Sequence, residues 1–425
     1  MPPILFVASV APDVGGLDGN DRNQNHRQRN VQESKPVSAA ADTLLNRAAA
    51  LVPALAANEA ATSNARSVPP ETIAAYHDAG ILRVMQPRRF GGHQESFGVF
   101  AHIVETLAEG CAASAWVYAV LAEHQWIIAC MNERAQADVW GDTPDAVASS
   151  SLAPRVTATR TAGGWLLSGR FPFSSGCQHA QWAILGARAE DAAGNAPTRY
   201  MLVPMREIEI VDDWHVLGLR GTGSCTLRVE GAFVPEHRTA LLADLNAGTT
   251  EGAALLPEYS LLRAPRGFLV PFSLPNVLFT LARRALALVP AVQRVRISRG
   301  VQAVATSEVA QLRLGEASAL IDAGVLLMRA RREQSIAALE AGAPITIEDV
   351  ARNRRDVAFA ADLARRGVET LVEVSGSNAV YDADALQPLL RDVLTIATHI
   401  VVSRQAAMVP YGRLLLGLPP GAGEA

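Results

Sequence analysis

Two histidines of this chain stand in settings that favour chemistry. His124 interrupts the apolar stretch of residues 112–130, where a buried imidazole costs free energy unless a partner satisfies it. A histidine can act as a general base because its ordinary pKa lies near neutrality. His399 is flanked by apolar residues, Ile396 and Ile400 among them, which predicts that it is buried. Both are candidates for proton transfer, and the structural alternatives are a satisfied core histidine and a surface histidine.

A glycine-rich loop, GLRGTGS at residues 218–224, places one arginine on backbone that can approach an anion closely. Arg220 is therefore a candidate for binding a phosphate or another anionic group, with Thr222 as a hydroxyl donor. The loop is not a dinucleotide fingerprint, because Thr226 stands where the third glycine is required. The alternative is that Arg220 simply pairs with an acidic neighbour.

Composition argues against several classes of function. The 425 residues carry a net charge of −4 without a basic patch, which argues against nucleic acid as a partner. The four cysteines are far apart and form no CxxC pair, so we expect neither a zinc site nor a disulfide framework, but a cytoplasmic protein. No unbroken apolar run reaches the ~20 residues that span a bilayer, so we expect no membrane contact.

Three successive segments must position these residues. Apolar residues recur at helical spacing from about residue 39, and again in stripes such as 321, 325 and 328 after about residue 271. Between them, short alternating runs predict strands, and the turn at residues 162–164 predicts a hairpin. The expected strands are 156–160, 163–169, 182–186, 199–204 and 226–230.

The order of these segments predicts an α+β fold. We expect a central β-barrel or sandwich between an N-terminal helical domain and a C-terminal four-helix bundle, after a disordered extension rich in polar residues. The expected boundaries are 1–38 for the extension, 39–145 for the first helical domain, 146–250 for the β domain and 251–425 for the bundle.

This order and several local motifs resemble the acyl-CoA dehydrogenase superfamily. PRRFGG at 87–92 is similar to a turn of that superfamily, and GGWLLSGRFPFSSG at 163–176 resembles the strand pair that walls its flavin. Arg391 and Asp392 are similar to the arginine–aspartate pair that precedes the last helix. True dehydrogenases commonly carry a catalytic glutamate soon after this pair. Residues 398–401 read THIV, without a carboxylate, which disfavours abstraction of a proton beside a thioester carbonyl.

Within the superfamily, four stretches resemble the oxygenase components of two-component flavin monooxygenases that hydroxylate 4-hydroxyphenylacetate and steroid phenols. These stretches are 149–154, 173–176, 218–224 and 233–238. The resemblance implies that reduced FMN or FADH2 arrives as a diffusible co-substrate from a separate NAD(P)H-dependent flavin reductase. With O2 it would form a C4a-hydroperoxyflavin that hydroxylates a small aromatic substrate, phenolic or polycyclic. It also implies a homotetramer.

The resemblance further implies roles for individual residues. His124 and Ser150 would hold the substrate's phenol group, His399 would lie near the flavin C4a, and Ser174 or Ser175 would hold the flavin N5–H. The structural alternative for these serines is a turn that caps Gly176. The implied catalytic residues are His124, His399 and Ser175, and the implied flavin contacts are Trp116, Ser151, Phe173, Ser174, Ser175, Arg220, Thr222 and Arg391.

Other functions stay open on the same residues. The same flavin intermediate oxygenates sulfur or nitrogen in other members of this branch, and His124 would then be dispensable. An acyl-CoA dehydrogenase-like enzyme with tightly bound FAD, or an inactive binding protein on this fold, are further alternatives. The segment 268–281 is bulkier than the helix expected there in the hydroxylases, which leaves the shape of the substrate pocket open.

Overall fold

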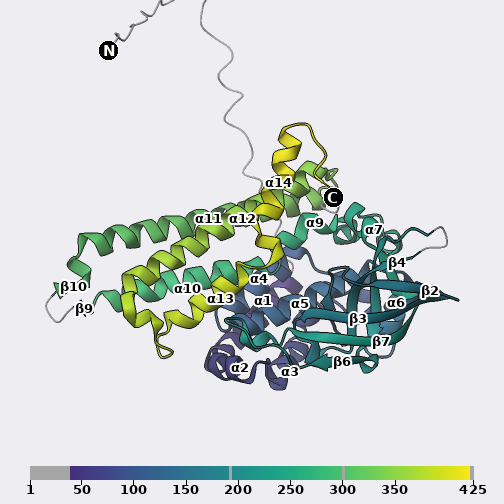
Figure 1. Ribbon diagram of the computed structural model, residues 1–425, viewed down its shortest axis with the longest axis horizontal. Helices are drawn as coiled ribbons and strands as arrows, with labels where there is room; N and C mark the ends of the chain where they lie inside the picture. The colour runs from purple at the N-terminus through teal and green to yellow at the C-terminus, as the bar shows by residue number, and fades with distance from the viewer. Residues whose placement is uncertain (1–38, 191–193, 299–301, 422–425) are drawn as a thin grey trace, which may run out of the picture. The chain divides into compact units, whose positions relative to one another are not determined.

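The computed structural model describes residues 39–190, 194–298 and 302–421 (Figure 1). The expected disordered extension, residues 1–38, lies outside the described residues. Helices come first, strands follow, and helices return, which confirms the predicted acyl-CoA dehydrogenase-like order. We propose the three-domain division given above, since its boundaries fall between α6 and β1 and between α7 and α8.

One of the N-terminal helices is buried along its whole length, between α4 on one side and β1 and the glycine-rich loop on others. That helix is α5, and its burial explains why apolar residues continue around all of its faces. Trp116, Val120 and His124 follow one another at four-residue spacing on α5, so they share one face. The helices of this segment are α1 Ala39–Ala57, α2 Glu59–Ala65, α3 Pro70–Asp78, α4 Phe97–Ala108, α5 Ala112–Ala129 and α6 Glu133–Trp140.

A mixed sheet forms the middle of the chain, in the order β6-β7-β3-β2-β4-β5-β8, with β1 paired to β4. Its strands are β1 Ala148–Ser151, β2 Thr157–Thr161, β3 Gly164–Ser174, β4 Trp182–Ala189, β5 Thr198–Pro204, β6 Ile208–Val211, β7 Cys225–Pro235 and β8 Thr239–Leu241. The predicted hairpin is the β2–β3 turn, where Thr161 pairs with Gly164. The five predicted strands are present, whereas β1, β6 and β8 were not predicted.

The sheet encloses a core of its own. Phe171 and Leu227 from β3 and β7 join Leu185 and Met201 from β4 and β5 in one buried cluster. The opposite face of β1 and β4 instead joins the helical core, to which Ala148 and Ile184 belong. Strands β1 and β4 therefore separate the sheet's own core from α5, and their helix-facing side chains are available to line a site.

The C-terminal helices pack as predicted, with α10, α11, α12 and α13 side by side (Figure 1). The predicted stripe at residues 321, 325 and 328 lies on α11 and is buried, and Val357 of the neighbouring α12 is fully buried as well. A small hairpin, β9 Ile297–Ser298 with β10 Gln302–Ala303, was not predicted. The helices are α7 Leu242–Ala247, α8 Glu251–Leu255, α9 Arg266–Leu269, α10 Pro275–Gln293, α11 Glu308–Glu340, α12 Ile347–Ser375, α13 Leu386–Ile396 and α14 Arg404–Leu415.

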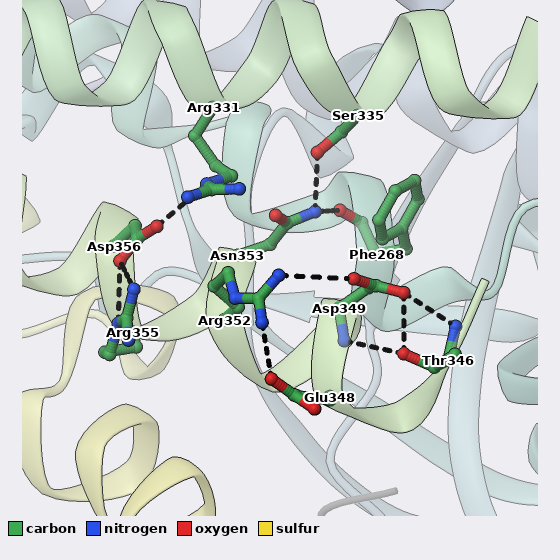
Figure 2. Close-up of polar contacts among 10 residues, drawn as sticks. All are labelled: Phe268, Arg331, Ser335, Thr346, Glu348, Asp349, Arg352, Asn353, Arg355 and Asp356. Carbon is green, nitrogen blue, oxygen red and sulfur yellow. Dashed lines mark hydrogen bonds and ion pairs between the residues drawn. The ribbon is translucent and has the colours of Figure 1, made fainter. Parts of the chain in front are cut away.

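A polar layer ties α9 to the long helices of the bundle. Figure 2 shows Asn353 of α12, whose Nδ2 donates to the carbonyl of Phe268 and to Ser335 Oγ, both at 2.9 Å. Thr346 and Asp349 form a capping box at the start of α12, each side chain accepting from the other's backbone N–H. Because Phe268 lies in α9, this layer fixes the short helix that carries Arg266.

The stretch Arg266–Gln293 is apolar and long enough to cross a membrane, although the sequence contains no unbroken apolar run of that length. Inside the protein, however, 67% of its most apolar window is buried. Such burial is typical of a core helix, and α10 packs in this way against α12 and α13.

Candidate active site

A chain of hydroxyl groups crosses from α5 to the glycine-rich loop. Trp116 Nε1 donates to Ser175 Oγ at 3.2 Å, and Ser175 Oγ lies 2.7 Å from Ser224 Oγ. Ser224 Oγ lies 2.7 Å from Thr222 Oγ1, which donates to the carbonyl of Leu219 at 2.9 Å. Trp116 and the three hydroxyl residues are all buried, so water does not compete for these bonds.

The carbonyl at the end of this chain determines the direction of every bond in it. Each hydroxyl has one proton and two lone pairs. Thr222 gives its proton to the Leu219 carbonyl, so Ser224 must donate to Thr222, and Ser175 must donate to Ser224. Ser175 also accepts from Trp116, which leaves one lone pair on Ser175 Oγ for a further donor.

The structure separates the two adjacent serines. Ser174 Oγ is fully buried and donates to Ser149 Oγ at 3.0 Å, away from the hydroxyl chain. Ser151 Oγ is similarly engaged, since it donates to the carbonyl of Pro172 at 2.7 Å. Of these serines, Ser175 is the one that Trp116 contacts.

His124 is a neutral histidine with a defined tautomer. Its Nδ1 lies 2.6 Å from the carbonyl of Ala148, and since a carbonyl cannot donate, Nδ1 carries the proton. Nε2 therefore presents a lone pair. Burial, opposed by the Ala148 bond and reinforced by the charge of Arg266, lowers the pKa of His124 to about 4. The pKa of His124 therefore lies below the ordinary histidine value near neutrality, and its hydrogen-bond partner is the backbone carbonyl of Ala148.

Ser150 lies on the strand that carries the partner of this histidine. It follows Ala148 by two residues on β1 and pairs with Ile184, so its side chain points to the same helix-facing side of the strand as that of Ala148. Ser150 and His124 therefore belong to one wall, at the end of α5 away from Trp116. His124 follows Trp116 by eight residues on α5, which places it about 12 Å further along the helix axis.

His399 lies at the Trp116 end. It caps the 3-10 turn η11 (Ile400–Val402), where its Nδ1 accepts from Val401 N at 3.3 Å, so Nε2 carries the proton of the neutral ring. Its ring centre lies 5.6 Å from that of Trp116, edge to face. Burial, with a smaller effect of Arg266, lowers the pKa of His399 to about 4. Its neighbour Ile396 is buried but Ile400 is 64% exposed, and His399 itself is half-buried, less buried than its apolar neighbours predict.

Arg266 is a charged residue that sequence reasoning missed. Its positive charge contributes to the lowered pKa of both His124 and His399, so it lies near both rings. The guanidinium stands 5.5 Å from the ring centre of Tyr200, and its buried Nε has no hydrogen-bond partner among the described residues. The sequence feature that could have pointed to Arg266 is its position immediately before an apolar helical stretch.

The glycine-rich loop presents a second arginine with spare donors. Arg220 Nε is buried without a hydrogen-bond partner in the described part of the chain, and no salt bridge of Arg220 is found there. This argues against simple pairing with an acidic neighbour. Phe173, at φ 64° and 63% exposed, stands edge to face with Trp214 at 6.2 Å, and not in the hydroxyl chain.

Helix α13 packs directly on this loop. A Cβ on Gly218 would lie 2.2 Å from the carbonyl of Arg391, so only glycine permits the approach. The neighbouring Asp392 Oδ1 accepts from the backbone N–H of Leu219 at 2.6 Å. Burial raises the pKa of Asp392 to about 6. The arginine–aspartate pair thus contributes backbone packing and one carboxylate contact to the loop.

These groups fit a reduced flavin. Ser175 offers a hydroxyl acceptor suited to a ring N–H, beside the edge of the Trp116 indole. Nε of Arg220 and Nε of Arg266, which have no hydrogen-bond partner among the described residues, suit anionic oxygens. The fit rests on donors and acceptors that the protein itself leaves unused.

Comparisons with known proteins agree with this geometry. Residues 277–404 match the family described as acyl-CoA dehydrogenase, C-terminal domain. The FADH2-dependent resorcinol hydroxylase oxygenase component of a Rhizobium species is 34% identical over 390 residues, which are 89% of this chain and 95% of that protein. The p-hydroxyphenylacetate 3-hydroxylase oxygenase component of Acinetobacter baumannii is 30% identical over 89% of this chain and 90% of its own. The chain belongs to the oxygenase components of flavin-dependent monooxygenases.

A solved structure of this family gives the same fold. The crystal structure of 3-HSA hydroxylase from Rhodococcus sp. RHA1 matches with a TM-score of 0.83 and 30% identity, covering 89% of this chain and 97% of that one. The protein is therefore an enzyme that uses reduced flavin, FMNH2 or FADH2, and O2. The predicted family, fold and cofactors are confirmed.

Within this oxygenase, the predicted residues fall into three groups. Trp116, Ser175, Thr222 and His399 come together around the hydroxyl chain. His124 and Ser150 share the wall at the other end of α5. The remaining predicted flavin contacts do not take part in the hydroxyl chain, and their roles stay predictions. They are Ser151, Phe173, Ser174, Arg220 and Arg391.

Proposed function

We propose that this oxygenase hydroxylates the ring of a small phenol, using reduced flavin delivered by a separate reductase. The observation that carries the proposal is that α5 has an acceptor beside each of two positions on one face: the remaining lone pair of Ser175 Oγ, next to Trp116, and Nε2 of His124. Bound reduced flavin supplies the activation of O2. The phenol substrates named for two relatives, resorcinol and p-hydroxyphenylacetate, support this class of substrate.

Ser175 holds the flavin N5–H in this proposal. Its own proton is directed to Ser224, so towards the ring it can only accept, and N5–H of a reduced flavin is a donor. Retaining that proton prevents the bound flavin from releasing hydrogen peroxide before the substrate reacts. The buried setting around Trp116 keeps out the water that would otherwise compete.

His124 and Ser150 hold the phenol hydroxyl. With a pKa of about 4, His124 is too weak a base to remove the phenol proton completely at neutral pH. Its Nε2 instead accepts a hydrogen bond from the hydroxyl, which increases electron density on the ring and favours attack by an electrophilic oxygen. The positive charge of Arg266 stabilises the negative charge that then develops on the substrate oxygen.

His399 donates from Nε2 on the flavin side. Its Nδ1 is engaged by Val401, so the ring is oriented and its remaining N–H is available to position oxygen near the flavin C4a. Arg220 and Thr222 serve the flavin's anionic groups, with Trp116 and Phe173 beside the ring. We assign supporting flavin contacts to Ser151, Ser174 and Arg391, in keeping with the family resemblance.

The protein depends on a flavin reductase as its partner, because oxygenase components receive reduced flavin from outside. We expect the purified chain to turn over only when chemically reduced flavin, or a flavin reductase with NADH, is supplied. Turnover can be measured as phenol hydroxylation under air. Turnover driven by NADH and oxidised flavin alone, without a reductase, would contradict the two-component account.

The free, buried cysteines among the described residues support a reducing, cytoplasmic setting.

We propose a homotetramer. Apolar side chains are exposed on two of the C-terminal helices. On α11, Leu312 is 72% exposed and Leu326 is 68% exposed, and Leu415 at the end of α14 is 72% exposed. A second copy packed on these helices would cover them. Sedimentation of the purified protein should give a mass near four chains, and a stable, active monomer would contradict the proposal.

A further inference from the structure

Leu219 holds an unusual backbone conformation at the centre of the glycine-rich loop. Its φ is 51°, in the left-handed region that disfavours a branched residue without an external constraint. The constraint is visible: Asp392 Oδ1, on α13, accepts from Leu219 N at 2.6 Å. Leu219 itself is buried, at 4% exposure. A carboxylate distant in the sequence therefore holds the N–H of the Gly218–Leu219 peptide.

The next peptide, Leu219–Arg220, ends the hydroxyl chain, because it carries the Leu219 carbonyl. The Leu219 carbonyl accepts from Thr222 Oγ1 at 2.9 Å, from the backbone N–H of Thr222 at 3.1 Å and from Trp214 Nε1 at 3.2 Å. The direction of the Thr222, Ser224 and Ser175 bonds follows from this one carbonyl, since each hydroxyl must pass its single proton onward. A Leu219 carbonyl turned elsewhere would free Thr222 to donate to Ser224, and Ser224 could then donate to Ser175.

We propose that Asp392 is a positioning residue for oxygenation: it fixes Leu219 and thereby orients the hydroxyl chain, so that Ser175 presents a lone pair to the flavin. The inference rests on the role proposed for Ser175. Asp392 acts through the loop, because the hydrogen bond it forms within the described part of the chain is with the Leu219 backbone N–H. The close packing of α13 on Gly218 places this carboxylate against the loop with little freedom to move.

The test uses the full-length protein and a variant that cannot accept a hydrogen bond. Asp392→Leu has a similar shape but removes the acceptor, whereas Asp392→Asn keeps an acceptor oxygen. Ser224→Ala breaks the chain in its middle, and Thr222→Val removes its last hydroxyl. Asp213→Ala is the matched control, because Asp213 Oδ1 also accepts a backbone N–H, that of Thr226 at 2.9 Å, outside the hydroxyl chain.

The first readout needs no flavin. In protein labelled at tryptophan nitrogen, the indole N–H resonance of Trp116, assigned through Trp116→Phe, reports the bond to Ser175. We expect this resonance to shift in Asp392→Leu, Ser224→Ala and Thr222→Val, and to stay in place in Asp392→Asn and Asp213→Ala. An unshifted resonance in folded Asp392→Leu overturns the inference. If that variant does not fold, unshifted resonances in both Ser224→Ala and Thr222→Val overturn it.

The second readout is the product formed per reduced flavin consumed, with p-hydroxyphenylacetate and resorcinol as probes. We expect Asp392→Leu to lower this ratio roughly five- to tenfold, the loss of about one hydrogen bond, and Asp392→Asn to restore it. The double variant Asp392→Leu/Ser224→Ala should be no worse than Ser224→Ala alone, since both act on one chain. If the losses of the two single variants add in the double variant, the inference is overturned. If Ser175→Ala instead leaves the product formed per reduced flavin unchanged, the proposed role of Ser175 is contradicted. The failure of the inference and the failure of the proposed function are therefore distinguishable.

Discussion

Replacing His124 with alanine should lower phenol hydroxylation by roughly 10²–10⁴-fold while reduced flavin is still consumed at close to the wild-type rate. The reason is that His124 is proposed to bind the substrate hydroxyl and lies eight residues along α5 from Trp116, which contacts Ser175. Product and hydrogen peroxide, measured together under air, separate the two outcomes: the variant should release peroxide in place of product.

The matched control for this variant is His93→Ala. The pKa of His93 is also lowered by burial, but His93 lies beside Gly80, outside the proposed site. It should hydroxylate like the wild type. If His124→Ala hydroxylates a true substrate at the wild-type rate, its phenol-binding role is wrong, and oxygenation at sulfur or nitrogen becomes the better account.

The pH dependence of phenol hydroxylation by the wild type also tests the role of His124. An ordinary histidine gains a proton as pH falls through about 6.5. Burial holds the pKa of His124 at about 4, so its Nε2 lone pair persists down to that pH. The His124 contribution should therefore be constant between pH 7 and about 5 and be lost only as pH approaches 4. A loss centred near pH 6.5 that disappears in His124→Ala would contradict this.

Replacing Ser175 with alanine should leave flavin binding nearly intact and make the release of hydrogen peroxide roughly ten- to a hundredfold faster. One buried hydrogen bond of this kind contributes about 1–3 kcal/mol, which corresponds to that range of rates. The measurement is the fraction of reduced flavin that ends as peroxide when substrate is present.

Ser168→Ala is the control for the same strand. Ser168 also lies on β3, but its Oγ accepts from Gly231 N on the exposed side of the hairpin. In Ser168→Ala, the fraction of reduced flavin that ends as peroxide should be the same as in the wild type. If Ser174→Ala releases peroxide and Ser175→Ala does not, the choice between the two serines is wrong.

Much of the fold follows from periodicity. Residues 112–130 are apolar without a polar face, and α5 is accordingly buried on all sides. His124 was recognisable because it interrupts that stretch. The β2–β3 hairpin was predictable because Gly163, at φ 79°, supplies the left-handed turn residue that such a connection needs.

Other features depend on contacts that leave no local pattern. The partner of His124 is a backbone carbonyl, which every residue possesses, so no sequence motif marks Ala148. The choice between Ser174 and Ser175 depends on a register shift between Phe171 and Ser174, which changes the side to which each side chain points. Arg266 contributes through its charge, next to histidines that lie far from it in the sequence.

The most direct test of the central claim is the origin of the oxygen atom in the product. The purified chain is mixed with chemically reduced FAD, a phenol such as resorcinol or p-hydroxyphenylacetate, and O2 carrying a heavy oxygen isotope. Mass spectrometry should then find one labelled oxygen atom added to the ring, with no requirement for NADH. A product whose new oxygen comes from water, or a protein that consumes reduced flavin and hydroxylates no phenol in a panel that includes these two, would contradict the account.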